Sequence, residues 1–458
     1  MNPLSSALRS GWCLAAIFTG VGALLPAANV VPPPPTKAAE KAARAPARTS
    51  LAWQIALVPH VGPGKLDEQI AKTQQAVAAA ADPGPQLERL GWLFVDQARV
   101  THDPGFYKLA ENCALALQEW DKNSAEALLL RGHVAQSLHR FKEAEAIARQ
   151  LVARREFALD HGLLGDALAD QGKLSEAIAA YQRMVDLQPS LQSYSRVAHG
   201  RWLKGDLAGA IEAAELAAGA GRQGSAESSA WIFTRLATLQ AQAGAGQKAE
   251  AAWAAAQRFV PDYAPALLLQ GRIALGAGRA EEAAALLQRA VAKNPLPEYQ
   301  WALADALRAA HRSSEAVAVE TELARRGAAN DPRTFSLYLA TRGEQPDLAL
   351  RLATRELGDR ADVFSYDALA WAQLGAGGFT EAWQSIEHAL AEGTKDARLF
   401  LHAAVIAGRL DRADAAEWLG RARALENLLL PSEREHLASA GKVPAVATAA
   451  HHFTPTAR

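Results

Sequence analysis

A repeating interval of 33 residues is the feature that most constrains this chain of 458 residues. An alanine in a similar local pattern recurs along the chain, mostly 33 or 34 residues after the one before it. These alanines are Ala144, Ala177, Ala210, Ala249, Ala283, Ala316, Ala349, Ala382 and Ala416. One interval, between Ala210 and Ala249, is 39 residues long and contains the glycine-rich segment 219–224. Self-similarity at this period predicts a helical solenoid, in which each copy buries its apolar face against its neighbours.

The clearest copy, residues 158–191, contains two amphipathic helices. Its apolar residues recur at steps of three and four on either side of Gly172, which is the spacing of one helix face. Pro189 ends the second helix, because proline lacks an amide donor and clashes with the preceding turn. Glycines that tolerate a positive φ angle recur at the turn in other copies, and prolines close other second helices. The turn glycines are Gly172, Gly205, Gly244, Gly278 and Gly377, and the closing prolines are Pro189, Pro261 and Pro295.

This copy resembles a tetratricopeptide repeat, whose pattern places small residues where the two helices touch and a proline at the end. Gly165 and Ala177 match the small positions, Tyr181 matches the aromatic position and Pro189 matches the terminal one. The first tryptophan of the pattern is absent. The resemblance implies an all-α, right-handed superhelical solenoid of about ten antiparallel helix pairs over residues 84–430. The composition agrees, because Ala, Leu, Glu, Gln and Arg favour helices.

Both ends of the solenoid are expected to carry a cap. Residues 65–81 place one apolar stripe on a helix, which predicts an N-terminal capping helix. Residues 432–440 predict a short C-terminal capping helix. A capping box is expected at its start, in which Ser432 and Glu435 satisfy each other's backbone amides. The remaining residues, 441–458, are predicted to form a disordered tail.

The N-terminal segment is typical of exported proteins. Residues 1–28 combine Arg9, an uncharged apolar run (11–25) and small residues at the end, which predicts a cleaved signal peptide. The run is short for a membrane span of about 20 residues, but an uncleaved anchor at 11–28 remains an alternative, as does a buried N-terminal helix. Residues 29–64 form a Pro/Ala-rich linker and an apolar lead-in. We therefore expect an exported, periplasmic protein, or an inner-membrane protein whose solenoid lies outside the cytoplasm.

Charge and motifs argue for binding rather than catalysis. The formal net charge is −1, without the basic stripe that is typical of nucleic-acid-binding proteins. The sequence contains no phosphate-binding glycine loop, HExxH, GxSxG or CxxC motif. Cys113 lies in a helical pattern and is interpreted as a small buried apolar residue, while His451 and His452 in the tail form a weak metal site at best. We therefore expect no enzymatic activity, cofactor, metal or nucleic-acid partner.

The candidate binding residues lie on the first helix of each copy. First helices of such arrays line the concave side. The residue after each small contact position, and residues one turn earlier or later on the same helix face, are therefore expected to project into the groove. Aromatic and arginine side chains there are typical of binding hot spots. The predicted groove residues are His133, Asp166, Arg196, His199, Trp202, Arg235, Thr238, Arg272, Trp301, Asp305, Tyr338 and Trp371. The alternative is that the tryptophans only fill gaps between helices and that the polar members are simply solvated.

These features predict a non-catalytic scaffold that binds a protein or peptide in its concave groove, outside the cytoplasm. One alternative is a membrane-tethered assembly factor for an envelope complex. A more remote alternative is an enzyme whose chemistry centres on His133, Asp166 and His199.

The chemistry of the partner is only partly constrained. The Lys and Asn that clamp a chaperone's terminal carboxylate in some tetratricopeptide domains are replaced by other residues at the matching positions. An acidic peptide remains a hypothesis. It would be attracted by His199 with Arg196, or by Arg235 with Arg272.

Overall fold

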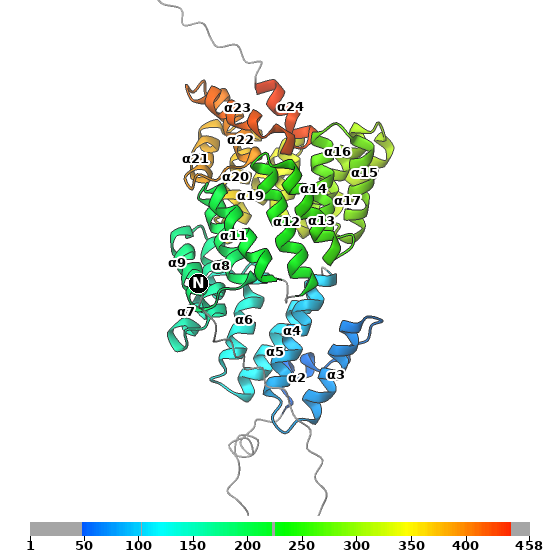
Figure 1. The fold of residues 1–458 in the computed structure, drawn as a ribbon, viewed down its shortest axis with the longest axis vertical. Coiled ribbons are helices and arrows are strands. Elements are labelled where there is room, and N and C mark those ends of the chain that lie inside the picture. The colour runs from blue at the N-terminus through cyan, green and yellow to red at the C-terminus, as the bar shows by residue number, and fades with distance from the viewer. Residues whose placement is uncertain (1–47, 102, 222–224, 441–458) are drawn as a thin grey trace, which may run out of the picture. The chain divides into compact units, whose positions relative to one another are not determined.

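The structure, a computed structural model, describes residues 48–101, 103–221 and 225–440. The predicted signal peptide, most of the linker and the predicted tail lie outside these residues. Within them the chain forms helices joined by short turns and contains no β-strand (Figure 1). The all-α prediction is confirmed.

Ten antiparallel helix pairs follow one another along the described chain, and each pair packs against the next (Figure 1). The first helices are α4 (Gly84–Thr101), α6 (Ala125–Ser137), α8 (Ala158–Asp170), α10 (Leu191–Leu203), α12 (Ala226–Gln242), α14 (Ala264–Gly276), α16 (Pro297–Ala309), α18 (Pro332–Arg342), α20 (Val363–Gly375) and α22 (Ala397–Arg409). The second helices are α5 (Gly105–Trp120), α7 (Phe141–Arg154), α9 (Leu174–Leu187), α11 (Leu207–Ala220), α13 (Gly246–Phe259), α15 (Ala280–Lys293), α17 (Ser313–Asn330), α19 (Pro346–Asp359), α21 (Phe379–Leu390) and α23 (Ala415–Ala424). This arrangement confirms a solenoid of about ten pairs.

Short helices flank the ten pairs. They are α2 (Leu51–Ala56), α3 (Lys65–Ala79), η2 (Glu426–Leu428) and α24 (Pro431–Ala440). At the N-terminal side, α2 packs on α5 and α3 packs on α4, with Trp53 of α2 fully buried. At the C-terminal side, α24 contacts α16, α18 and α22 as well as α23. The last helix therefore reaches first helices of pairs far back along the chain.

The capping box predicted at the start of α24 is wrong. The helix begins at Pro431, because the fixed φ angle and missing amide of proline suit a first helical position. Glu433, rather than Glu435, accepts a hydrogen bond from a backbone amide before the helix. The Ser432 hydroxyl instead donates to the Asp305 carboxylate at 2.6 Å. A residue expected to cap its own helix thus joins α24 to α16.

The small residues of the repeat pattern allow the two helices of a pair to touch. At Gly165 on α8, an added Cβ would lie 2.3 Å from a ring carbon of Tyr181 on α9. Ala177, where α9 crosses α8, is fully buried. Because only glycine leaves room for the tyrosine ring, the small and aromatic positions of the pattern are explained by packing.

The turn within a helix pair requires a positive φ angle. The five predicted turn glycines have φ angles between 73° and 84°, which confirms their role. His139, His311 and Asp411 occupy the corresponding turn in other pairs, with φ angles of 59°, 60° and 49°. A left-handed conformation costs an L-residue roughly 1–2 kcal/mol, because its Cβ approaches the following carbonyl oxygen. These three turns are therefore strained relative to the glycine turns.

Replacing His311 by glycine is expected to raise the free energy of unfolding by roughly 0.5–1 kcal/mol, since relief of strain exceeds the added chain entropy of glycine. Gly278→Ala is the matched control and is expected to lower it by roughly 1 kcal/mol. An added Cβ at Gly278 would meet no atom within 4 Å, so that loss is purely conformational. Urea denaturation measures both. Equal stability of the two variants would contradict the strain argument.

Helix pairs far apart in the sequence also touch one another. The Thr394 hydroxyl, after α21, donates to the carbonyl oxygen of Leu203 on α10 at 2.6 Å, across 191 residues. Gly172 and Gly205 permit such approaches, because an added Cβ on either would lie 2.3 Å from a carbonyl oxygen of the facing segment. At Gly172 that segment is Ala361, before α20. Segments before α20 and after α21 therefore pack against the turns that follow α8 and α10.

Candidate functional site

The twelve predicted groove residues all lie on first helices of the pairs. In chain order they are His133 on α6, Asp166 on α8, Arg196, His199 and Trp202 on α10, Arg235 and Thr238 on α12, Arg272 on α14, Trp301 and Asp305 on α16, Tyr338 on α18, and Trp371 on α20. Their surroundings divide them into two groups. Helices η2 and α24 cover the group on α14 to α20, whereas the group on α6 to α12 lies away from these C-terminal helices.

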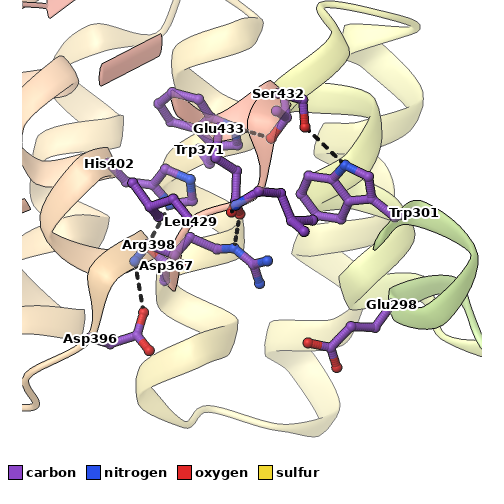
Figure 2. A network of polar contacts seen from close by, with 12 residues as sticks. Glu298, Trp301, Asp367, Trp371, Asp396, Arg398, His402, Leu429, Ser432 and Glu433 are labelled. Carbon is purple, nitrogen blue, oxygen red and sulfur yellow. Dashed lines mark hydrogen bonds and ion pairs between the residues drawn. The ribbon is translucent and has the colours of Figure 1, made fainter. Parts of the chain in front are cut away.

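The C-terminal segment binds the inward side of α14 and α16 through hydrogen bonds. The indole N–H of Trp301 donates to the Ser432 hydroxyl at 3.1 Å (Figure 2). Ser432 in turn donates to Asp305 through both its hydroxyl and its backbone amide. Arg272 donates to the carbonyl oxygen of Leu428 at 3.0 Å. Three groove positions, Arg272, Trp301 and Asp305, are thus linked with residues that come more than 120 positions later in the chain.

Burial corrects the sequence-based expectation for this part of the groove. Trp301, Asp305, Tyr338 and Trp371 are at most 4% exposed. The Trp371 ring stacks on His402 with 4.0 Å between ring centres. Burial raises the pKa of Asp305 to about 6, although the hydrogen bonds from Ser432 oppose this shift. Trp301 and Trp371 therefore fill gaps between helices, and a partner cannot reach these four side chains while α24 is in place.

Two buried polar pairs lie near the C-terminal segment, and no motif in the sequence predicted either of them. Arg398 on α22 donates to the Glu433 carboxylate on α24 (Figure 2). His402 Nδ1 lies 2.7 Å from an oxygen of Asp367, and both side chains are at most 3% exposed. No motif marks these residues in the sequence, because each pair joins different helices. Arg398 and Glu433 join α24 to α22, and His402 and Asp367 join α22 to α20.

In the group on α6 to α12, the charges of Asp166 on α8 and Arg196 on α10 neutralise each other. The Arg196 guanidinium makes a bidentate contact with Asp166, with N–O distances of 2.8 and 2.6 Å. The Tyr181 hydroxyl donates to the same carboxylate at 3.1 Å. One repeat earlier, His133 Nε2 lies 3.0 Å from an Arg99 nitrogen. Burial and then the Arg99 charge lower the pKa of His133 to about 4, so its ring is neutral at pH 7.

The residues of the hypothetical catalytic centre do not form a hydrogen-bonded constellation. Within the described residues, no hydrogen bond joins any two of His133, Asp166 and His199. Asp166 is already committed to Arg196, which leaves no carboxylate to orient either imidazole. Nor does this described part of the chain hold a group of three or more potential metal ligands.

The inward faces of α10 and α12 carry aromatic rings and an arginine. The Trp202 indole donates to Gln242 at 2.8 Å, and its ring stacks on Phe364 of α20 at 5.5 Å. The Thr238 hydroxyl donates only to its own helix backbone. Burial and then the charge of Arg235 lower the pKa of His199 to about 4. This imidazole is therefore neutral at pH 7 and adds no second positive charge to the surface.

Arg235 is a half-buried arginine for which the described residues provide no carboxylate and no hydrogen-bond partner. Its guanidinium lies over the Trp202 ring, 5.4 Å from the ring centre. Among the residues that the structure describes, no carboxylate pairs with it and no hydrogen bond engages it. Burial alone lowers its pKa. The side chain borders a hollow of about 10 Å³, space for one water molecule, together with Ser195, His199 and Trp231.

A second hollow, of about 310 Å³, lies at the start of α8 beside the end of α9. Phe157 and Leu159 border it and are 59% and 51% exposed. Leu187 at the end of α9 completes its apolar rim. The sequence analysis did not predict this patch, because the local sequence does not show which apolar residues remain exposed in the folded chain.

Comparison with known proteins identifies the repeat. Residues 129–191, 234–296 and 268–332 match the family model described as tetratricopeptide repeat. A search of curated proteins finds no match to the chain.

Solved structures include several similar folds at low sequence identity. A thermophilic tetratricopeptide protein of Thermus thermophilus is 18% identical, with a TM-score of 0.34, and 39% of this chain covers 92% of that one. The pilF protein of Pseudomonas aeruginosa is 19% identical, with a TM-score of 0.36 and coverages of 50% and 97%. The human IFIT1 dimer with PPP-AAAA is 15% identical, with a TM-score of 0.46 and coverages of 71% and 77%.

The family match and the structure agree on the same unit. The matched segments fall on α6 to α9 and on α12 to α17, and the same turn geometry extends to pairs outside them, such as α10 with α11 and α20 with α21. The chain therefore contains tetratricopeptide repeats, and the helix pairs outside the matched segments have the same helix–turn–helix form.

Proposed function

We propose that this protein is a non-catalytic scaffold that binds a protein partner on the inward faces of α10 and α12. The observation that carries the proposal is the contrast between the two halves of the predicted groove. The chain's own C-terminal segment occupies the inward side of α14 to α18. The surface of α10 and α12 instead presents an unpaired arginine and the 38% exposed Trp231. Aromatic and arginine side chains of this kind are enriched among residues that dominate binding energy.

A preformed helical surface suits this role. Trp202 is held by a hydrogen bond and by ring stacking, so it loses little conformational freedom when a partner docks. Arg235 rests on the Trp202 ring and is partly desolvated before binding. Such preorganisation reduces the entropic cost of association.

Site-specific photo-crosslinking tests the location. A photoreactive phenylalanine analogue at position 231 is expected to capture a defined protein in the native cell. The same analogue at position 379, on the second helix α21, is the matched control, because Trp231 and Phe379 are 38% and 39% exposed. Equal capture at both positions, or capture at 379 alone, would contradict binding on the inward face.

We further propose that the scaffold acts outside the cytoplasm, in the periplasm. The support is the apolar run at 11–25 after Arg9, which is typical of a signal peptide. None of the helices in the described residues is long and apolar enough to span a membrane. The tethered alternative, an assembly factor anchored by residues 11–28, depends on whether the signal is cleaved.

Intact-mass measurement of the exported protein distinguishes the two forms. Cleavage is expected to remove residues 1–28 and to leave a mature N-terminus at Asn29. An exported protein that retains the full mass would instead favour the anchored form, and a full-length protein found only in the cytoplasm would contradict export.

A further inference from the structure

Two arginines on the inward surface occupy equivalent positions in successive repeats but have different surroundings. Arg196 and Arg235 are 39 residues apart, the same interval that separates the repeat alanines Ala210 and Ala249. Arg196 on α10 donates two hydrogen bonds to Asp166 on α8, the first helix of the preceding repeat. The repeat therefore defines a geometry in which an arginine meets an acidic side chain from the preceding first helix.

At the next repeat the acidic side chain is missing. His199 stands 33 residues after Asp166, the interval between Ala177 and Ala210, and so occupies the acid's position. Its ring is neutral at pH 7 and cannot balance the charge of Arg235. In the described residues no other carboxylate takes this role. The arginine is left with its donors unused beside a hollow, although a half-buried charge is costly unless it is paired.

We propose that Arg235 binds a carboxylate of the protein partner, which would pair with its guanidinium as Asp166 pairs with that of Arg196. The group is an aspartate, glutamate or C-terminal carboxylate, and the exposed face of Trp231 receives an adjoining apolar side chain. This assignment rests on the proposed function, because it concerns the same surface of α10 and α12.

The geometry favours a carboxylate over a phosphate-rich ligand. A guanidinium matches the two oxygens of a carboxylate with parallel hydrogen bonds, as Arg196 and Asp166 demonstrate in this chain. Nucleic acids instead require several cations along a strand. On this surface Arg196 pairs with Asp166, Arg272 pairs with Glu298, and the ring of His199 is neutral. Of the four basic residues predicted to attract an acidic peptide, only Arg235 therefore carries a charge without a carboxylate partner among the described residues.

A pair of short peptides tests the inference by calorimetry on the full chain. Acetyl-Ala-Phe with a free C-terminal carboxylate is expected to bind roughly 10- to 100-fold more tightly than its amide, as for one charge-assisted hydrogen-bond pair. Arg235→Gln is expected to abolish this preference. His199→Asp is expected to abolish this preference as well, because the new carboxylate would form an ion pair with Arg235 inside the protein. Equal binding of acid and amide, or an acid preference that survives Arg235→Gln, would overturn the proposal.

Thermal unfolding provides a readout that separates a binding role from a structural one. Arg235→Gln is expected to change the melting temperature little, because the described residues lose no ion pair or hydrogen bond and only the contact with the Trp202 ring is removed. Arg196→Gln, the matched control, is expected to lower it, since Asp166 loses its counter-charge. His199→Asp is expected to raise it. A marked destabilisation by Arg235→Gln would show that the side chain is structural.

The outcomes distinguish this inference from the proposed function. If crosslinking at position 231 captures a protein but the chain binds the peptide acid and the amide equally, the proposed scaffold function is supported and the carboxylate assignment is wrong. If the acid binds but crosslinking at 231 captures nothing, the site is real and the scaffold role fails. Binding of inorganic phosphate in preference to the peptide acid would overturn the carboxylate assignment in favour of a phosphate-bearing ligand.

Discussion

Replacement of Trp301 by alanine is expected to lower the free energy of unfolding by about 3–5 kcal/mol, which is the usual cost of removing a fully buried tryptophan. The side chain has no exposed surface. Its ring meets Tyr338 edge to face at 5.9 Å, and its N–H donates to Ser432 on α24. The substitution therefore leaves a cavity in α16 and also removes a contact that holds the C-terminal helix.

Equilibrium denaturation measures the loss, and hydrogen exchange locates it. The amides of α24 are expected to exchange faster in the variant, because α24 loses part of its attachment. Trp231→Ala is the matched control and is expected to change stability little, since Trp231 is 38% exposed. Trp301→Phe keeps an aromatic ring and should be intermediate. If Trp301→Ala cost no more than Trp231→Ala, the packing described for α16 and α24 would be incorrect.

Removal of Arg398 is expected to be similarly damaging. Arg398→Met leaves the 1% exposed Glu433 without its counter-charge, and breaking a buried pair in this way costs about 3–5 kcal/mol. Arg325→Met, which removes an exposed i,i+3 partner of Glu322, is the control and is expected to have no measurable effect. A double-mutant cycle with Glu433→Gln isolates the pair, because the double variant should lose less than the two single variants together.

The same pair predicts a dependence on pH. Burial opposes ionisation of Glu433, but the charges of Arg398 and Arg272 together with the hydrogen bonds from the Leu430 amide and Arg398 outweigh it and hold the pKa below the usual 4.5. Stability from this carboxylate is therefore fully present above about pH 4.5 and is lost as the pH falls through the lowered pKa. In Arg398→Met this acid-dependent loss is expected to shrink. An unchanged acid profile in the variant would contradict the assigned pairing.

The two largest predictions concern the same structural feature, which is the attachment of α24 to the inward side of earlier repeats. The charge pair of Arg398 and Glu433 and the hydrogen bonds of Ser432 act on one short helix from different sides (Figure 2). Loss of this attachment would expose the inward side of α14 to α18. The available binding surface therefore depends on how firmly the C-terminal segment is held.

The sequence predicted which helices carry the residues of the candidate site, but it did not predict which side chains surround each of them. The register correctly placed Arg196 and Arg235 on first helices, since the helical period is a local property. It did not distinguish them, because both are arginines in similar local sequence. The distinction comes from the preceding repeat, where Asp166 and His199 differ. Recognising it required the observation that an arginine at this position reaches back across one helix interface.

The sequence by itself determined the repeating unit of this protein. The positive φ angles at Gly172 and Gly278 and the close contact of Gly165 with Tyr181 arise within one 33-residue copy, so the local pattern records them. Only the tertiary structure decided which inward faces remain accessible. The contact between Trp301 and Ser432 spans 131 residues, and that between Leu203 and Thr394 spans 191. A periodic pattern repeats the same local geometry but does not specify which distant copies meet, because that depends on the accumulated rotation of the whole stack.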